Sequence, residues 1–380
     1  MMNLNTSNTS NTSSAPVVRI GVLGAGTIAK EFCDEFVRGG ALIVGVADIV
    51  KERADALAAS HGARSVCGGM GDLLSAFPDV TLVYVGVPPA FHSDAVLRAL
   101  EAGKHVLCEK PLSLSGTDSA LMCAAARRHR AAQVCAINFP LRFVPAFFEL
   151  QRLLRNGYVG DIRSVDIVLH IPRWPRTWQA EWVGQRAQGG VLRELGSHLI
   201  FALHELCGTP RTVRRIVGQT SYDASPGANP SAAEVAANAL VELHAGVAIA
   251  GVTRTPPPLV RVDMRCNSVV ERELITLAVA GSAGRLELRE FTCLFGAQSS
   301  GPLADLLSTA GSAASDAPAF MSSTPCALKT LAAVKTALTT GVAQRGDLVG
   351  LEYGQQTQRV LEAILSSAGE WIHIEDPIDT

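Results

Sequence analysis

Three features that would place the chain in other classes of protein are missing from its 380 residues. It has no long run of Lys and Arg, and its net charge of -2 gives no basic surface for nucleic acid. Its nine cysteines include no Cys-x-x-Cys pair, which argues against a disulfide framework or a zinc knuckle and favours reduced thiols. Its most apolar stretch, 236–252, contains Asn238, Glu242 and His244 and is too polar to span a membrane. We therefore expect a soluble cytoplasmic protein with no nucleic-acid or membrane partner.

Residues 1–16 also lack the basic start and apolar core of a targeting signal, so we predict a disordered polar tail. The remaining length fits two domains, 17–138 and 139–380. In the first, short apolar runs alternate with helical stretches, a rhythm that predicts a doubly wound parallel sheet of the Rossmann type. The expected strands are 17–23, 42–47, 82–87, 105–108 and 133–137, and the expected helices are 27–38, 51–61, 70–77, 91–102 and 115–130.

The second half has longer strands with alternating apolar residues, which predict an α+β domain built on a large, mainly antiparallel, open sheet. The expected strands are 162–170, 212–218, 238–252, 274–280, 285–289 and 370–375, with helices at 144–156 and 353–367 and a long loop at 299–325. An open apolar face would need a cover, so we expect a homodimer or homotetramer formed through this sheet.

A strand at the start of the first domain runs into a Gly-x-Gly-x-x-Ala turn and then into a helix. Gly24 allows the tight turn, Gly26 allows backbone N–H groups to approach a pyrophosphate, and Ala29 allows the helix to pack closely on the strand. With Thr27 and Ile28 at the start of the helix, this segment predicts a dinucleotide-binding site.

Asp48 ends the second expected strand, where its carboxylate can bind the ribose hydroxyls of NAD and repel the phosphate of NADP. It is alternatively the N-cap of the next helix, and the nearby Lys51 and Arg53 leave NADP open as the cofactor. Pro88 and His92 follow the strand at 82–87, so we place both at the cofactor site, although His92 is equally suited to capping its helix.

Two segments carry candidate catalytic groups. Glu109-Lys110-Pro111 ends a strand at the edge where a nicotinamide would lie, and a cis Lys-Pro bond would aim the lysine into a cleft. Lys110 could then polarise a substrate oxygen, unless Glu109 and Lys110 form only a surface ion pair. Glu194 and His198 lie four residues apart, so on a helix they share a face and the carboxylate can orient the imidazole for proton transfer.

The Glu194 and His198 pair also suits a metal ion, but no third ligand lies at helical spacing, so we expect no metal. Three of the four tryptophans lie just before this segment, and indole rings stack well on sugar rings. Trp174 and Trp178 are therefore candidate substrate-binding residues, with packing of the helix on the sheet as the alternative for Trp178.

Taken in order, these motifs resemble those of the Gfo/Idh/MocA oxidoreductases, named for glucose-fructose oxidoreductase, inositol dehydrogenase and a rhizopine catabolism protein. The resemblance runs from Val17 to the closing helix and includes Arg142-Phe143-Val144-Pro145 and Gly189-Gly190-x-x-x-Glu194-x-x-x-His198. It implies hydride transfer between nicotinamide and a carbinol carbon of a sugar, cyclitol or related hydroxy compound. Arg142 joins the expected substrate-binding residues on this basis.

The resemblance implies that Lys110 is the active-site lysine, that His198 is the acid/base group, and that Glu194 stands where aspartate is usual. Pro89 and Phe201 replace residues that are often Asn and Asp, which suggests a less hydroxylated substrate. Two other functions stay open: an NAD-binding sensor without turnover, and an NAD-dependent glycoside hydrolase that releases no net NADH.

Overall fold

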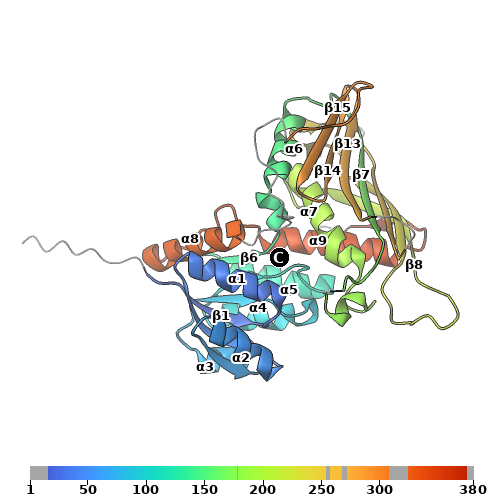
Figure 1. Ribbon diagram of the computed structural model, residues 1–380. Coiled ribbons are helices and arrows are strands. Elements are labelled where there is room, and N and C mark those ends of the chain that lie inside the picture. Colours follow the sequence, from blue (N-terminus) through green and yellow to red (C-terminus); the bar gives the residue numbers. More distant parts are fainter. Residues whose placement is uncertain (1–15, 178, 254–256, 268–271, 308–323, 375–380) are drawn as a thin grey trace, which may run out of the picture.

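The computed structural model describes residues 16–177, 179–253, 257–267, 272–307 and 324–374, so all of the predicted tail except Pro16 lies outside the described residues. Two sheets dominate the chain, and helix α9 (Leu351–Ser366) lies between them (Figure 1). This helix packs on α5 (Gly116–His129) of the first sheet and on β8 (Val213–Ser221) of the second. Residues far apart in sequence therefore join the two halves.

The first sheet has six parallel strands in the order β3-β2-β1-β4-β5-β6, as a doubly wound fold requires. Helices cover both faces, since α1, α2 and α8 share one buried cluster with the sheet and α3, α4, α5 and α9 share another. The strands are β1 (Arg19–Leu23), β2 (Leu42–Asp48), β3 (Arg64–Cys67), β4 (Leu82–Val85), β5 (His105–Cys108) and β6 (Cys135–Ile137). The remaining helices are α1 (Thr27–Arg38), α2 (Lys51–Ser60), α3 (Met70–Ala76) and α4 (His92–Glu101).

The second sheet has nine strands in the order β16-β15-β14-β13-β7-β12-β9-β8-β17, and only the β12–β7 pair is parallel. The predicted fold class is therefore confirmed for both sheets. The strands are β7 (Ile162–Ile171), β9 (Ala236–Leu243), β12 (Val260–Cys266), β13 (Leu274–Gly281), β14 (Gly284–Arg289), β15 (Cys293–Gln298), β16 (Ala304–Asp305) and β17 (Ile372–His373), with β8 as above. Helices α6 (Pro145–Arg155), α7 (Ser197–Leu206) and α9 accompany it, and β10 (Ala248–Ile249) pairs separately with β11 (Val252–Thr253).

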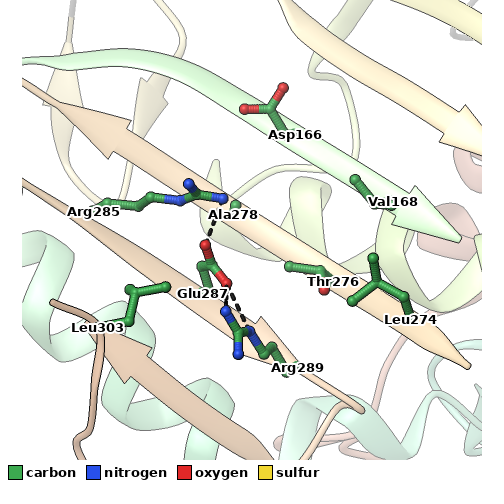
Figure 2. Close-up of a pocket in the computed structure, with 9 residues that line it drawn as sticks. All are labelled: Asp166, Val168, Leu274, Thr276, Ala278, Arg285, Glu287, Arg289 and Leu303. Carbon is green, nitrogen blue, oxygen red and sulfur yellow. Dashed lines mark hydrogen bonds and ion pairs between the residues drawn. The ribbon is translucent and has the colours of Figure 1, made fainter. Parts of the chain in front are cut away.

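The two faces of the second sheet differ in chemistry. Along β7, Val165, Ile167 and Leu169 are buried, whereas Asp166, Val168 and His170 alternate with them on the outer face and are partly exposed. A hollow of about 380 Å³ lies on that outer face. Figure 2 shows Arg285 and Arg289 at this hollow, where both form ion pairs with Glu287. The apolar alternation thus places the core under one face and leaves the other lined with charges.

The structure corrects several expected elements. β3, β12 and β15 were not predicted, and the expected strand 238–252 ends at Leu243. The expected loop 299–325 contains β16 and the first two residues of α8 (Thr324–Thr340), while 308–323 lie outside the described residues. Helix α8 packs on α1, where Leu331 and Val334 are buried in one cluster with Phe36 (Figure 1). Within the described residues, no helix is both long and apolar enough to cross a membrane.

Candidate active site

The glycine turn between β1 and α1 has the form that a dinucleotide site needs. Gly24 has φ +91°, and a Cβ there would lie 2.6 Å from the Gly86 carbonyl oxygen, so only glycine fits. Gly26 differs, because a Cβ there would meet no atom within 4 Å. Thr27 and Ile28 are exposed on the first turn of α1. The turn thus presents open backbone N–H groups at a helix N-terminus.

Asp48 lies beside this turn, at the end of β2. One carboxylate oxygen accepts the Ala25 N–H and the other accepts the Val50 N–H, both at 2.8 Å. The N-cap of α2 is Val50, so Asp48 does not cap this helix. Lys51 is engaged by Asp55. The charge next to the glycine turn is therefore negative.

His92 occupies a different place from the one expected. Its ring is buried, with Nε2 2.8 Å from the Val87 carbonyl oxygen and Nδ1 3.0 Å from that of Pro111. Burial lowers the pKa of this imidazole. Both nitrogens face backbone carbonyl groups, so His92 joins the loops after β4 and β5, and its expected contact with a cofactor stays a prediction. Pro88, in the first of these loops, is partly exposed.

Glu109 is also turned inward. Its carboxylate accepts hydrogen bonds from the Tyr84 hydroxyl and the Asn138 amide, each at 2.8 Å, and from the Lys110 N–H at 3.3 Å. Burial raises the pKa of this carboxyl. Glu109 therefore joins the ends of β4, β5 and β6 instead of forming a surface ion pair with Lys110, and its expected contact with a cofactor stays a prediction. Tyr84 and Asn138 were missed, although Asn138 follows a buried strand at the functional edge.

Lys110 points in the predicted direction, toward the second domain, and its peptide bond to Pro111 is cis. The Nζ atom lies 3.0 Å from Glu194 Oε2 and 3.3 Å from the Glu194 carbonyl oxygen. The two side chains are only 14% and 13% exposed, so solvent screens this ion pair weakly. The structure thus joins the two candidate segments through a direct contact between residues 84 positions apart.

The segment that carries Glu194 is not an ordinary helix. Leu192–Gly196 forms a π-helical turn, which continues into α7. A π turn closes with i→i+5 hydrogen bonds, so the face shared by positions i and i+4 of an α-helix is rotated here. Gly189, three residues before this turn, has to be glycine, because a Cβ at that position would lie 2.1 Å from the Val183 carbonyl oxygen.

His198 lies on the first turn of α7, fully buried and edge-on to the rings of Phe139 and Phe291. Neither ring nitrogen has a hydrogen-bond partner among the described residues. Burial, aided by the nearby charge of Lys110, holds the pKa of His198 well below its ordinary value. The expected orientation of His198 by Glu194 is therefore wrong in this structure, because the carboxylate binds the ammonium of Lys110 instead.

Two expected substrate-binding residues are engaged elsewhere. Arg142 donates to both carboxylate oxygens of Glu205 at 2.7 Å. Trp174 is 7% exposed, and its indole N–H donates to the Val183 carbonyl oxygen at 3.2 Å. Trp174 is thus packed in the interior of this structure and its contact with a substrate stays a prediction, while Trp178 lies outside the described residues. No cluster of three metal-ligating side chains occurs in the described part of the chain.

The glycine turn, the parallel sheet and the lysine at its carboxyl edge define a two-domain protein of the dinucleotide-binding class. Residues 18–138 match the oxidoreductase family with an NAD-binding Rossmann fold, and residues 147–287 match the GFO/IDH/MocA C-terminal domain. The chain belongs to the Gfo/Idh/MocA oxidoreductase family.

Two relatives are named for reactions of a cyclitol and of a sugar derivative. Inositol 2-dehydrogenase 3 of Saccharopolyspora erythraea is 34% identical over 44% of this chain and 49% of that protein. The 1,5-anhydro-D-fructose reductase of Ensifer adhaerens is 32% identical over 47% of this chain and 54% of that one. The chain thus spans about half the length of these curated relatives. Levoglucosan dehydrogenase in complex with NADH shares the fold, with a TM-score of 0.75 at 18% identity over 95% of this chain and 100% of that one.

Proposed function

We propose that the protein is an NAD(P)-dependent oxidoreductase that transfers hydride between nicotinamide and a carbinol carbon of a sugar, cyclitol or related hydroxy compound. The observation that carries this proposal is the contact between Lys110 Nζ and Glu194 Oε2 at 3.0 Å, beside the neutral imidazole of His198. A fixed cation and a neutral base at the carboxyl edge of a parallel sheet suit reversible oxidation of an alcohol. The activities named for the relatives point to the same substrate class.

The glycine turn suits a dinucleotide in shape and charge. The open space at Gly26 and the exposed Thr27 and Ile28 leave room for a pyrophosphate at the N-terminus of α1. Each oxygen of Asp48 accepts one backbone N–H and keeps a lone pair for a ribose hydroxyl. When bound, the nicotinamide supplies the two-electron hydride chemistry. Asp48 favours NAD, and NADP stays as the second cofactor to be tested.

Three residues stabilise charge or transfer the proton in this proposal. Lys110 donates a hydrogen bond to the substrate oxygen and stabilises the alkoxide that develops as the alcohol is oxidised. Glu194 holds the ammonium of Lys110 in place through the 3.0 Å contact. His198 accepts the hydroxyl proton through a ring nitrogen, neither of which has a hydrogen-bond partner among the described residues.

The apolar surroundings of His198 bear on the substrate. Phe201 is buried and stacks on Phe139, with ring centroids 4.3 Å apart. Pro89 is also buried, at the start of the short 3-10 helix Pro89–Phe91 that follows β4. Neither residue offers a side-chain hydrogen bond to a sugar hydroxyl, so we infer a substrate with fewer hydroxyl groups than an inositol.

A turnover screen of polyols, aldoses and deoxy sugars with NAD⁺ and NADP⁺ tests the proposal. We expect one compound to give steady NADH formation, with K110M and H198N reducing kcat at least 100-fold while the Kd for NADH changes less than threefold. K104M is the matched control, because Lys104 precedes β5 at the end of the strand opposite Lys110 and its ammonium donates to the Pro78 carbonyl oxygen. Unchanged turnover in K110M and H198N would contradict the proposed roles. NADH binding without turnover would favour a sensor, and nitrophenol release without net NADH would favour a glycosidase.

We further propose that the outer face of the second sheet forms a homodimer or homotetramer contact. Leu240 and Leu274 are exposed on this face among paired charges such as Asp166 with Arg261. Light scattering at several protein concentrations measures the assembly, and a monomer at all of them would contradict this contact.

A further inference from the structure

The buried carboxylate of Glu234 lies directly beneath the start of the catalytic segment. Glu234 is 1% exposed, and its Oε1 atom accepts the Leu192 N–H at 2.9 Å. Leu192 is two residues before Glu194, at the beginning of the π-helical turn. The first N–H groups of a helical segment have no partner within the segment, so a carboxylate from elsewhere can fill the place of an N-cap.

Gly190 makes this approach possible. A Cβ at Gly190 would lie 2.4 Å and 2.5 Å from the two carboxylate oxygens of Glu234, and the residue has φ +109°. Gly190 has no side chain with which to cap the segment itself. The second glycine of the Gly189-Gly190 pair thus serves the close approach of a carboxylate, rather than a phosphate.

Glu234 lies in the loop just before β9, and backbone hydrogen bonds hold this loop on both sides of Glu234. The Ala233 N–H donates to the Gly184 carbonyl oxygen at 2.8 Å, and the Val235 N–H donates to that of Ser221 at 2.9 Å. The Cys266 thiol donates to the carbonyl oxygen of Glu234 at 3.0 Å. These contacts hold the loop that carries the carboxylate at the start of β9, so Glu234 acts as a fixed reference for the π-helical turn.

From this geometry we propose that Glu234 is a positioning residue that sets the rotation of the catalytic segment, and with it the place of Glu194 and His198. The proposal rests on the proposed oxidoreductase function. A displacement of about 1 Å at a reacting group costs roughly 100-fold in rate, so loss of this one anchor has a large expected effect on kcat. Binding of NADH at the glycine turn of the first domain should not change.

Two conservative variants separate the hydrogen bond from the charge. E234Q keeps an oxygen that accepts the Leu192 N–H, so we expect kcat within threefold of wild type. E234D keeps the charge but withdraws the carboxylate by one methylene, so we expect kcat to fall at least tenfold, with the Kd for NADH unchanged. E287D is the matched control, since Glu287 is as deeply buried at 3% exposure but lies on the outer face of the sheet. The opposite order, with E234Q impaired and E234D active, would overturn the proposal, as would wild-type kcat in both.

A second measurement keeps the test independent of turnover. Hydrogen–deuterium exchange of the peptide covering 190–198 should be at least tenfold faster in E234D than in wild type, and unchanged in E234Q and E287D. If the wild-type protein turns over no compound in the screen, the proposed function fails but this exchange result still supports the anchor. Equal exchange in E234D and wild type would overturn it.

Discussion

Replacing Glu194 by Gln tests which of its two neighbours the carboxylate serves. The sequence pairs it with His198, whereas the structure pairs it with Lys110 at 3.0 Å. At an effective dielectric constant of 20, two charges at that distance attract by about 5.5 kcal/mol, and the cost of removing both from water cancels much of this. We take about 1–3 kcal/mol as the net coupling, which corresponds to roughly 5- to 150-fold in kcat.

A double-mutant cycle measures this coupling. K110M alone is expected to lower kcat about 100- to 1000-fold, as loss of one oxyanion-stabilising donor does. E194Q should lower kcat about 5- to 150-fold, and K110M/E194Q should be no slower than K110M, because Glu194 acts through the ammonium. E194Q/H198N should instead combine the two single effects to within about 0.5 kcal/mol.

The assay is steady-state formation of NADH with the best compound of the screen, with the Kd for NADH and the thermal melting temperature measured for every variant. Variants that bind NADH normally and melt within a few degrees of wild type qualify for the cycle. Additive effects of K110M and E194Q, with coupling between E194Q and H198N instead, would refute the structural pairing and restore the relay expected from the sequence.

Three further predictions concern the cofactor site and stability. Gly24→Ala places a Cβ 2.6 Å from the Gly86 carbonyl oxygen at φ +91°, so it should lower the free energy of unfolding by about 2–4 kcal/mol. Gly26→Ala places a Cβ where no atom lies within 4 Å, so it should leave the melting temperature unchanged and weaken NADH binding at least tenfold. Equal stability of the two variants would contradict this contrast. Asp48→Asn removes the charge that disfavours the phosphate of NADP, so the ratio of kcat/KM for NADP⁺ to that for NAD⁺ should rise about tenfold, and an unchanged ratio would place specificity elsewhere. Burial lowers the pKa of His204 to about 3, whereas the same histidine in the unfolded chain binds a proton near pH 6.5, so the folded state loses stability as pH falls below 6.5. Between pH 7.5 and pH 5.5, the free energy of unfolding measured by denaturant titration should fall by about 1.3 kcal/mol less in His204→Gln than in wild type. Equal losses in the two proteins would contradict the low pKa.

Local sequence pattern predicted the first sheet because each strand and its glycine turn are encoded within a few neighbouring residues. β3 was missed because Arg64–Cys67 is a four-residue edge strand with no buried position. Helix α8 was missed because its Ala, Leu and Thr residues form no clear apolar face at helical spacing. Its position depends on packing against α1. That packing joins residues about 300 positions apart and leaves no local signature.

In the candidate site, too, local pattern predicted some residues, whereas contacts between distant parts of the chain were missed. Gly24, Asp48 and Lys110 lie at the carboxyl edge of the first sheet, as the sequence predicts, because each stands at or just after the end of a strand; their roles stay predictions. The partner of Glu194 was wrong because a π-helical turn and a contact across 84 positions decide it. Glu234 could not be found, since a buried carboxylate 42 positions from the N–H that it binds follows no motif.

Transfer of deuterium from NADH that carries deuterium at both C4 positions of its nicotinamide to the carbonyl form of the best substrate tests the central claim most directly. Mass spectrometry of the alcohol product should show one deuterium per molecule with wild-type protein, carried on the carbinol carbon, and label incorporation at least 100-fold slower with K110M. Alcohol product without deuterium, or the same rate of incorporation in K110M, would contradict direct hydride transfer at a site organised by Lys110.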